Sequence, residues 1–355
     1  MDDLMMRATV GEQLRAQGIS RRGFMKFCAT TASIMALSPL LVPRIAEALA
    51  KARRPSVIWL PFQECTGCTE SLTRSHAPTL ESLIFDAISL DYHETLQAAA
   101  GHDAENARNK AMEANWGEYF LAVDGSIPLA NKGYSTIGGV SNVELLKKVA
   151  HGAKAIIAIG TCASFGGLPK ASPNPTGAVA VRDLITDKPI INVSGCPPLP
   201  LAITGVLAQV LTFGELPELD HLGRPKAFYG QTIHDRCYRR PFYERGQFAE
   251  SFDDEGAKQG WCLYKLGCKG PVTYNACPTV KWNMGVSFPI ESGHGCIGCS
   301  EPDFWDWQGV YHPLSTTRWG GYQTLGAAAA VGVAAGAVAA LAARRKQRPV
   351  GEDET

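Results

Sequence analysis

The sequence predicts an α/β protein in which a parallel, doubly wound sheet is followed by a small irregular domain and a C-terminal transmembrane helix. Three observations lead to this prediction. In the first half, short apolar runs alternate with longer helical segments such as 142–151. From about Arg224 onwards the chain is irregular, rich in Gly and Pro, and carries six cysteines. Near the end, residues 324–343 form an uncharged stretch of mostly Ala, Gly, Val and Leu.

The composition indicates a folded protein with more than one domain. The chain has 355 residues, of which 45% are hydrophobic and 19% charged, and this length suits two domains plus appendages. Lys and Arg together number 34, as do Asp and Glu, so no charge excess recruits nucleic acid to the chain as a whole. We therefore expect no nucleic-acid partner.

Residues 1–50 have the pattern of a twin-arginine (Tat) signal peptide. Arg21 and Arg22 precede an apolar stretch over 27–42, and small residues follow where such a signal is cleaved. An ordinary amphipathic first helix is the alternative. The Tat export machinery carries folded proteins, so the remaining cysteines would meet iron before they meet an oxidising compartment. Disulfides are therefore not expected, and Cys28 would leave with the signal.

The first domain, expected over 51–223, holds the predicted sheet. Its strand-like runs are 56–62, 88–92, 119–124, 155–160 and 189–193. In sheets of this kind, ligands bind beyond the carboxyl ends of the strands. Cys65 and Cys68 follow the first run, Cys162 the fourth and Cys196 the fifth. Four sulfurs that are far apart in the sequence are therefore expected to meet at one edge of the sheet.

Short-spaced cysteines favour a metal site with thiolate ligands. Ten of the 11 cysteines follow residue 50 without a surrounding set of histidines, which favours iron–sulfur clusters. Cys65 and Cys68 form a Cys-x-x-Cys turn before a predicted helix, whose N-terminal amides favour thiolates. That motif alone also occurs in redox dithiols and zinc knuckles. Four cysteines at strand ends are more specific for a cluster.

The second domain, expected over 224–315, supplies two further groups of candidate ligands. One group has four members if a histidine is counted, although a histidine near a cysteine is more often incidental. The other has three members, which is enough for a three-iron cluster. The four are His234, Cys237, Cys262 and Cys268, and the three are Cys277, Cys296 and Cys299. Ligation would replace part of the hydrophobic core that such an irregular segment lacks.

A membrane anchor is expected over 322–343, with residues 344–355 as a cytoplasmic tail. Twenty helical residues rise about 30 Å, the thickness of the hydrocarbon core of a bilayer. Arg344, Arg345 and Lys346 follow the apolar stretch, and basic residues favour the cytoplasmic side. The exported domains would then lie on the periplasmic face of the inner membrane. A soluble Ala-rich helix is the alternative, because Ala and Gly are poor membrane residues.

Several motifs together resemble the small subunit of membrane-bound uptake [NiFe] hydrogenases. They are 64–70 (ECTGCTE), 195–198 (GCPP), 262–271 (CLYKLGCKGP) and 293–299 (GHGCIGC). The resemblance implies a flavodoxin-like first domain with a proximal [4Fe–4S] cluster held by Cys65, Cys68, Cys162 and Cys196. It implies a distal [4Fe–4S] cluster held by His234, Cys237, Cys262 and Cys268, and a medial [3Fe–4S] cluster held by Cys277, Cys296 and Cys299.

By the same resemblance, the chain is the electron-relay subunit of a hydrogenase. The large subunit would hold the Ni–Fe centre that splits dihydrogen, and this chain would bind no nickel. Electrons would leave through the three clusters to a membrane cytochrome b and the quinone pool. Glu64 is a candidate for proton exit or for tuning the proximal cluster, against a plain solvated carboxylate. Gly67 and Gly167 stand where oxygen-tolerant relatives have extra cysteines, which implies a standard proximal cluster and ordinary oxygen sensitivity.

Two other function classes remain open on the residues alone. A cluster-bearing component of a quinone reductase would account for the first domain, but not for the signal, the second domain or the anchor. A zinc or disulfide scaffold fits the cysteine count, but not export after folding. Colour separates only the zinc or disulfide scaffold, because iron–sulfur proteins are brown, whereas zinc and disulfides leave a protein colourless. Dihydrogen-dependent dye reduction by the co-purified complex separates a hydrogenase from a quinone reductase.

Overall fold

The computed structural model describes residues 54–84, 88–213, 216–307 and 309–314, together with isolated positions between 22 and 47. The described residues up to His312 belong to one compact unit. Apart from those isolated positions, the predicted signal peptide lies outside the described residues, as do the predicted anchor and tail. Within the described part of the chain, no helix is both long and apolar enough to span a bilayer.

The predicted doubly wound sheet is present and has five parallel strands. They are β1 (Ser56–Pro61), β2 (Ser89–His93), β3 (Phe120–Asp124), β7 (Ala155–Ile159) and β9 (Ile190–Val193). Their spatial order is β2-β1-β3-β7-β9. Counted along the chain this is the order 2-1-3-4-5 of flavodoxin-like sheets. Each strand agrees with its predicted run to within one residue at either end, so the α/β prediction is confirmed.

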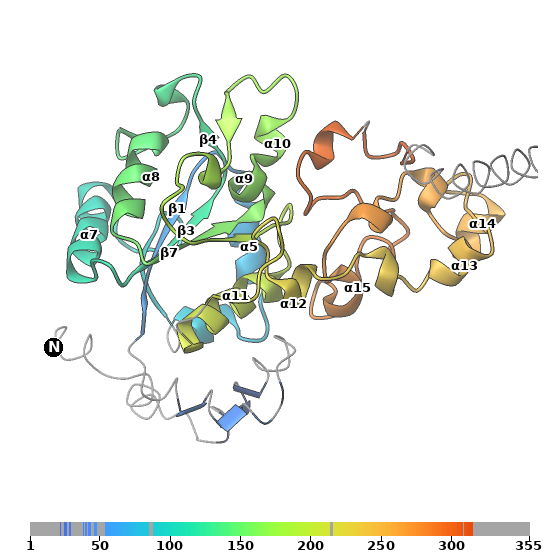
Figure 1. Ribbon diagram of the computed structural model, residues 1–355, viewed down its shortest axis with the longest axis horizontal. Helices are drawn as coiled ribbons and strands as arrows, with labels where there is room; N and C mark the ends of the chain where they lie inside the picture. The colour runs from blue at the N-terminus through green and yellow to red at the C-terminus, as the bar shows by residue number, and fades with distance from the viewer. Residues whose placement is uncertain are drawn as a thin grey trace, which may run out of the picture. The chain divides into compact units, whose positions relative to one another are not determined.

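Helices lie on both faces of the sheet (Figure 1). One face is covered by α7 (Gly101–Ala114) and α8 (Asn142–His151), and the other by α5 (Gly67–Thr73) and α11 (Pro200–Phe213). The predicted helix over 142–151 coincides with α8, and the Ser141 hydroxyl caps its first turn by accepting a backbone hydrogen bond. The sheet is therefore shielded from water on both sides.

Alternate side chains of each strand point to opposite faces of the sheet. On β1, Val57 and Trp59 belong to the core beneath α5 and α11, whereas Ile58 and Leu60 belong to the core beneath α7 and α8. None of these side chains is more than 1% exposed. Because both faces are buried, the run over 56–62 is apolar almost throughout and does not alternate with polar residues.

Shorter elements complete the first half. They are α6 (Leu80–Ser82), β4 (Ile127–Pro128), η3 (Lys132–Tyr134), β5 (Thr136–Ile137), β6 (Val140–Ser141), α9 (Gly160–Phe165), α10 (Gly167–Lys170), β8 (Ala178–Val179) and η4 (Val181–Asp183). Two small antiparallel ladders pair β4 with β8 and β5 with β6. Since α9 follows β7 directly, it begins at the carboxyl edge of the sheet.

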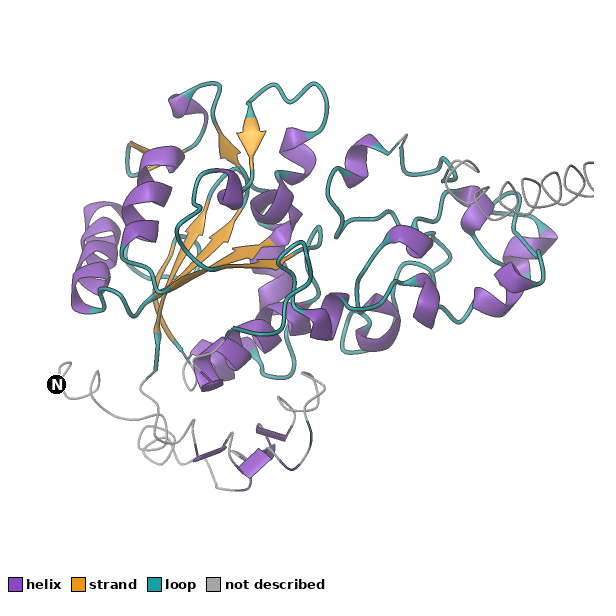
Figure 2. Cartoon of the chain, in the orientation of Figure 1, coloured by secondary structure: helices purple, strands orange, loops and turns teal. Residues whose placement is uncertain are grey.

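From residue 216 to residue 307 the chain consists mainly of loops and short helices (Figure 2). These are α12 (Lys226–Tyr229), η5 (His234–Arg236), α13 (Arg240–Glu244), α14 (Glu255–Lys258), η6 (Tyr264–Leu266), η7 (Gly270–Val272), α15 (Cys277–Val280) and η8 (Phe304–Asp306). None of them is longer than five residues. The prediction of an irregular second half agrees with this structure.

The irregular half shares its core with one face of the sheet. Phe228 and Ile290 belong to the same apolar cluster as Trp59 and the α5 and α11 side chains. Cys277 and Cys296 are members of that cluster as well. Thiols in this half therefore stand in positions that aliphatic side chains fill in most domains.

Leu121 on β3 tests the importance of the sheet core. Its side chain is fully buried, so Leu121→Ala should lower the free energy of unfolding by about 2–5 kcal/mol. Leu129 is 46% exposed, so Leu129→Ala is a matched control that should change it by about 0.5 kcal/mol at most. Urea unfolding followed by circular dichroism measures both, and equal losses would contradict the packing described here.

Candidate metal centres

The structure brings four cysteines together at the carboxyl edge of the sheet. We call Cys65, Cys68, Cys162 and Cys196 the proximal group. Cys65 lies in the loop after β1, Cys68 in α5, Cys162 in α9 and Cys196 in the loop after β9. Each of the other three thiols raises the pKa of Cys68 by electrostatic repulsion. The four sulfurs are therefore close in space. All four are free thiols, and Cys65 is exposed whereas Cys68 is buried.

Burial sets the protonation of three of the proximal thiols, those of Cys68, Cys162 and Cys196. It raises the pKa of Cys68 well above its ordinary value, and Asp124 and the neighbouring thiols raise it further. Burial also raises the pKa of Cys162 to about 11 and that of Cys196 to about 12. Without metal, these thiols are therefore protonated at neutral pH. Iron ions supply the positive charge that favours the thiolate form, so the residues present fit an iron–sulfur cluster.

Glycines keep space open beside the proximal sulfurs. Gly160 has a φ of +85°, and a Cβ atom there would lie 2.5 Å from the sulfur of Cys68. Gly167 has a φ of +59°, and a Cβ atom there would lie 2.6 Å from the sulfur of Cys162. A side chain at either position would be strained in its backbone and would displace a sulfur. Both glycines thus belong to the construction of the site.

A histidine and three cysteines line one pocket in the second half of the chain. We call His234, Cys237, Cys262 and Cys268 the distal group, and all four are in the pocket wall with Leu263 and Ile290. Spacing alone does not predict that His234 lies here. Burial and Arg240 lower the pKa of His234, so its imidazole is neutral at neutral pH and offers a nitrogen lone pair to a metal.

Backbone N–H groups point at the sulfurs of the distal group. The N–H groups of Gly270 and Cys296 donate to the sulfur of Cys268 at 3.4 and 3.3 Å. Burial raises the pKa of Cys262 to about 11, and a backbone hydrogen bond from Tyr264 acts in the opposite direction. Hydrogen bonds of this kind favour thiolates and tune clusters that thiolates hold.

The three remaining cysteines form the medial group, Cys277, Cys296 and Cys299. Burial raises the pKa of all three thiols, and Cys299 adds to the shifts at Cys277 and Cys296. Cys277 lies in the apolar core, and the N–H of Gly298 donates to the sulfur of Cys296 at 3.4 Å. The structure therefore brings together the three cysteines that the sequence left for a three-ligand site.

The three groups lie in series. The medial thiol of Cys299 lies close enough to Cys196 of the proximal group to raise the pKa of the Cys196 thiol, and the Thr161 hydroxyl bonds to the backbone beside both cysteines. Cys296 of the medial group donates its backbone N–H to the sulfur of Cys268 in the distal group. The medial group is therefore directly adjacent to both of the others.

Two carboxyl groups lie near the proximal group. Asp124, at the end of β3, is fully buried and accepts a hydrogen bond from the indole of Trp59 at 3.0 Å. Burial, reinforced by Glu64, raises the pKa of Asp124 to about 7. Burial also raises the pKa of Glu64 itself. Glu64 was identifiable beside a cysteine motif, whereas no local pattern indicates Asp124, whose burial depends on strand packing.

Two buried cations near the sulfurs were also not predicted. Lys269 is 1% exposed, and its backbone N–H donates to the carbonyl oxygen of Cys296 at 2.6 Å. Arg224 is 1% exposed and forms ion pairs with Asp220 and Glu301. Lys269 directly follows a cysteine of the distal group, which is a signal that could have identified it. No comparable local signal marks Arg224.

Comparison with known proteins gives consistent matches over most of the chain. The model of the C-terminal part of the NiFe/NiFeSe hydrogenase small subunit matches residues 229–312, and that of the 20 Kd subunit of NADH ubiquinone oxidoreductase matches residues 65–210. The uptake hydrogenase small subunit of Azotobacter vinelandii is 53% identical over 340 residues, which cover 94% of this chain and 95% of the relative. That of Cupriavidus necator is 50% identical over 355 residues, which cover 99% of each chain.

Solved structures show the same likeness. The reduced, active form of the Ni-Fe-Se hydrogenase from Desulfomicrobium baculatum is 36% identical to this chain, with a TM-score of 0.70. The match covers 74% of this chain and 100% of that chain. The similarity therefore includes the fold as well as the sequence.

His93, at the end of β2, provides a pH test of the proximal region. It is 1% exposed, and its Nε2 atom lies 3.3 Å from the hydroxyl of Thr69, the neighbour of Cys68. Burial lowers the pKa of His93 from 6.5 to about 4, so between these values only the unfolded chain takes up the proton. The stability contributed by neutral His93 is therefore complete above pH 6.5 and falls by about 3 kcal/mol as the pH drops to 4.

His93→Gln should remove this part of the pH dependence of unfolding, as measured by thermal denaturation between about pH 4.5 and 7. His102→Gln, at an exposed position of α7, is the matched control and should leave the dependence unchanged. An unchanged pH profile in His93→Gln would show that His93 is not held neutral by burial.

Proposed function

This chain belongs to the family of uptake [NiFe] hydrogenase small subunits, and we propose that it carries electrons from the large subunit through three iron–sulfur clusters. Like its relatives, it is the electron-transfer subunit of a hydrogenase whose active site lies in the large subunit. The ligand sets, the number of clusters and the final acceptor are the parts that the proposal adds.

The proposal assigns a [4Fe–4S] cluster to each of the proximal and distal groups and a [3Fe–4S] cluster to the medial group. When bound, such clusters supply one-electron redox chemistry over a wide range of potentials. The residues of this chain hold the iron, bury it and place N–H groups against the sulfurs. The serial arrangement of the three groups is the observation that carries the proposal, because electron transfer along a chain of clusters requires neighbouring clusters to be close together.

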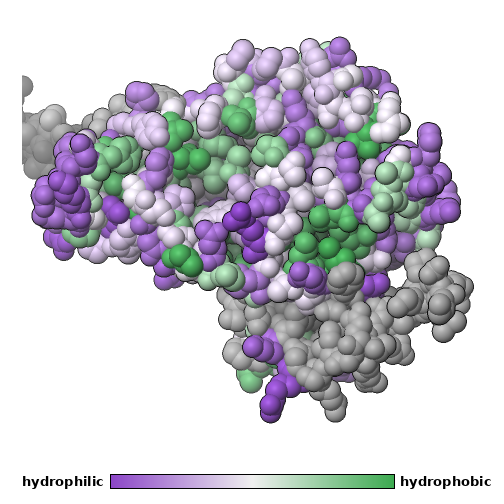
Figure 3. All heavy atoms as spheres, turned by 180° about the vertical axis from the view of Figure 1, so that it is seen from behind, coloured by the Kyte–Doolittle hydropathy of each residue, from purple (hydrophilic) through white to green (hydrophobic). Residues whose placement is uncertain are grey.

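The exposed thiol of Cys65 supports the position of the large subunit. A cluster ligand that is open to solvent in the isolated chain is accessible to another protein, and the proximal group is where electrons would enter. Apolar side chains also gather in separate patches between polar ones on the face shown in Figure 3. The docking proposal rests on the exposure of Cys65 and not on these patches. The large subunit is therefore proposed to dock over the loop that carries Cys65.

Export and membrane attachment are proposed from the ends of the sequence. The twin-arginine pattern within 1–50 supports Tat export, and the apolar stretch within 322–343 supports an anchor on the periplasmic face of the inner membrane. A membrane cytochrome b that passes electrons to the quinone pool would then be the acceptor for the distal group. Nickel is assigned to the large subunit and not to this chain.

The proximal cluster is proposed to be a standard one. A Cβ atom at Gly67 would lie 3.2 Å from the sulfur of Cys65, so a cysteine at either Gly67 or Gly167 would stand beside an existing ligand. With glycine at both positions, the proximal group has its four cysteines and no more. Ordinary oxygen sensitivity follows from this composition.

A quinone reductase component is the other function class with some support. The match to the 20 Kd subunit of NADH ubiquinone oxidoreductase spans 65–210, which includes the proximal group only. The match over 229–312, which includes His234 and the rest of both other groups, is to a hydrogenase model. The hydrogenase assignment accounts for all three groups.

Cys299→Ala in the purified heterodimer tests the proposed relay. Removal of one of three medial ligands should abolish the electron paramagnetic resonance signal of an oxidised three-iron cluster. Hydrogen-dependent dye reduction should fall by about tenfold or more, which corresponds to ~1.4 kcal/mol on the barrier. Ser251→Ala is the control, because Ser251 is exposed and belongs to none of the three groups. A three-iron signal that survives in Cys299→Ala would refute the medial assignment.

His234→Cys tests the distal assignment. A thiolate in place of a neutral imidazole adds negative charge, so the reduction potential of the distal cluster should fall. Potentiometric titration of the heterodimer measures the potential directly. His102→Cys makes the same substitution at an exposed position of α7 and should leave all potentials unchanged. Should His234→Cys also leave them unchanged, His234 is not a ligand.

A further inference from the structure

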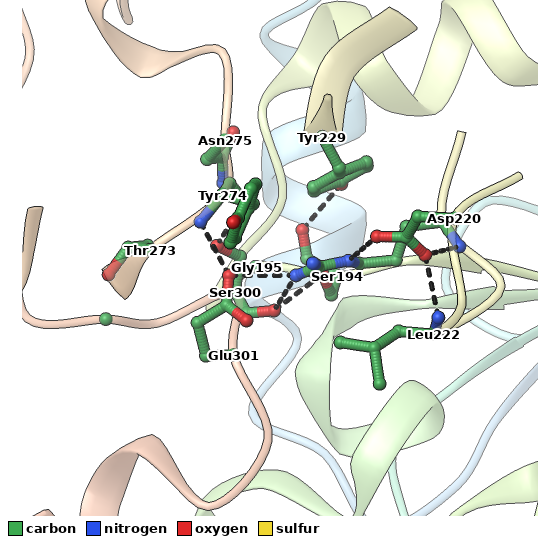
Figure 4. A network of polar contacts seen from close by, with 12 residues as sticks. Ser194, Gly195, Asp220, Leu222, Tyr229, Thr273, Tyr274, Asn275, Ser300 and Glu301 are labelled. Atoms are coloured by element: carbon green, nitrogen blue, oxygen red, sulfur yellow. Dashed lines mark hydrogen bonds and ion pairs between the residues drawn. The ribbon is translucent and has the colours of Figure 1, made fainter. Parts of the chain in front are cut away.

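The loops that carry Cys196 and Cys299 are joined by direct hydrogen bonds (Figure 4). The hydroxyl of Ser194 donates to the carbonyl oxygen of Ser300 at 2.8 Å. The hydroxyl of Thr161 donates to the carbonyl oxygen of Cys299 and accepts a backbone N–H from the Cys196 loop at 2.9 Å. Ser194 and Ser300 are fully buried. These bonds connect the proximal group to the medial group without an intervening element.

We call the hydrogen-bonded contact between the Cys196 loop and the Cys299 loop the junction. Arg224 connects this junction to a third segment. Its Nη1 atom donates to the carbonyl oxygen of Ser300 at 3.1 Å and to the Glu301 carboxylate at 2.9 Å. Its Nε atom donates to the Asp220 carboxylate at 2.8 Å. Glu301 also accepts the backbone N–H of Tyr274 at 2.6 Å. One guanidinium therefore holds the residues after Cys299 against the turn that begins at Asp220.

Tyr229 completes the junction on the side of the proximal group. Its hydroxyl donates to the carbonyl oxygen of Ser194 at 2.7 Å. The Arg224 guanidinium lies 5.3 Å from the ring of Tyr229 and 5.7 Å from the ring of Tyr274. Two rings and three oxygen acceptors thus fix the guanidinium in one orientation.

The burial of this network indicates that its geometry matters. Arg224 is 1% exposed and Glu301 6% exposed. Buried ion pairs lose much of their attraction to desolvation, so they are weak sources of stability, but loss of the arginine would leave two carboxylates uncompensated. A network of this kind can fix the positions of the segments that it joins even where it adds little stability. The positions that it fixes are those of two ligand-bearing loops.

We propose that Arg224 is a positioning residue that sets the separation between the proximal and medial clusters and thereby the rate of electron transfer between them. This role rests on the proposed function, because it requires clusters at both groups. With clusters bound at both groups, one electron would pass from the proximal cluster, which would be oxidised, to the medial cluster, which would be reduced. Electron tunnelling weakens steeply with distance, so a small displacement of the Cys299 loop changes the rate.

Arg224→Lys and Tyr229→Phe separate positioning from charge. Lysine keeps the positive charge but lacks the planar fork, so it cannot reach Ser300, Glu301 and Asp220 together. Tyr229→Phe keeps the ring and removes only the hydrogen bond to Ser194. Both variants are made in the complete heterodimer, and their iron and sulfide contents are compared with those of the unmodified complex.

Electron paramagnetic resonance of partly reduced samples measures the magnetic interaction between the proximal and medial clusters, which depends on their separation. We expect this interaction to change in both variants and most strongly in Arg224→Lys. Hydrogen-dependent dye reduction per assembled complex should fall about tenfold in Arg224→Lys, equivalent to ~1.4 kcal/mol on the barrier.

Arg108→Lys is the matched control. Arg108 is 2% exposed, forms an ion pair with Glu105 and lies 5.2 Å from the ring of Tyr92, but neither partner belongs to a ligand-bearing loop. The substitution should leave the magnetic interaction unchanged. An unchanged interaction and rate in Arg224→Lys with full cluster content would overturn the proposal, as would an equal change in Arg108→Lys.

If the Arg224→Lys complex does not assemble, the Tyr229→Phe complex tests the proposal. An unchanged magnetic interaction between the clusters of the Tyr229→Phe complex would also overturn the proposal. The absence of iron–sulfur clusters from the small subunit of the unmodified heterodimer would instead refute the proposed function.

Discussion

The burial of thiols inside an apolar core is the constraint on which this structure depends. Cys277 and Cys296 belong to the same hydrophobic cluster as the sheet residues, and burial raises the pKa of each. A protonated thiol in such a place is a poor ligand until a metal compensates the charge of its thiolate. In the second half, helices of five residues or fewer cannot form a stable framework alone. Metal binding by these cysteines, as proposed above, would therefore stabilise the folded state of that half.

The parallel sheet supplies what the second half lacks, which is a rigid edge. Its strand order places the ends of β1, β7 and β9 so that four cysteines converge, and glycines such as Gly160 leave room beside the sulfurs. The junction around Arg224 then couples this edge to the medial group. A sheet with a firm core thus positions an irregular segment through a few buried polar contacts.

The first half of the fold was predictable because its strands are buried on both faces. Continuous apolar runs mark such strands, and the rule that ligands lie beyond their carboxyl ends placed Cys162 and Cys196 beside Cys68, as the structure has them. The grouping of the second half was less accessible. Spacing left His234 open, and the family resemblance singled it out. In the folded chain His234 lines the same pocket as Cys262 and Cys268, and no local sequence pattern encodes this long-range arrangement.

Long-range contacts explain what the sequence did not reveal. Asp124 meets Trp59 across 65 positions, and Arg224 meets Glu301 across 77. The export signal and the anchor remain predictions, because they lie largely outside the described residues.

Metal analysis of the anaerobically purified heterodimer tests the central claim most directly. Two four-iron clusters and one three-iron cluster require about eleven iron atoms per small subunit beyond the iron of the active site, with acid-labile sulfide in similar amount. Folded, colourless protein with negligible iron and sulfide would contradict the account.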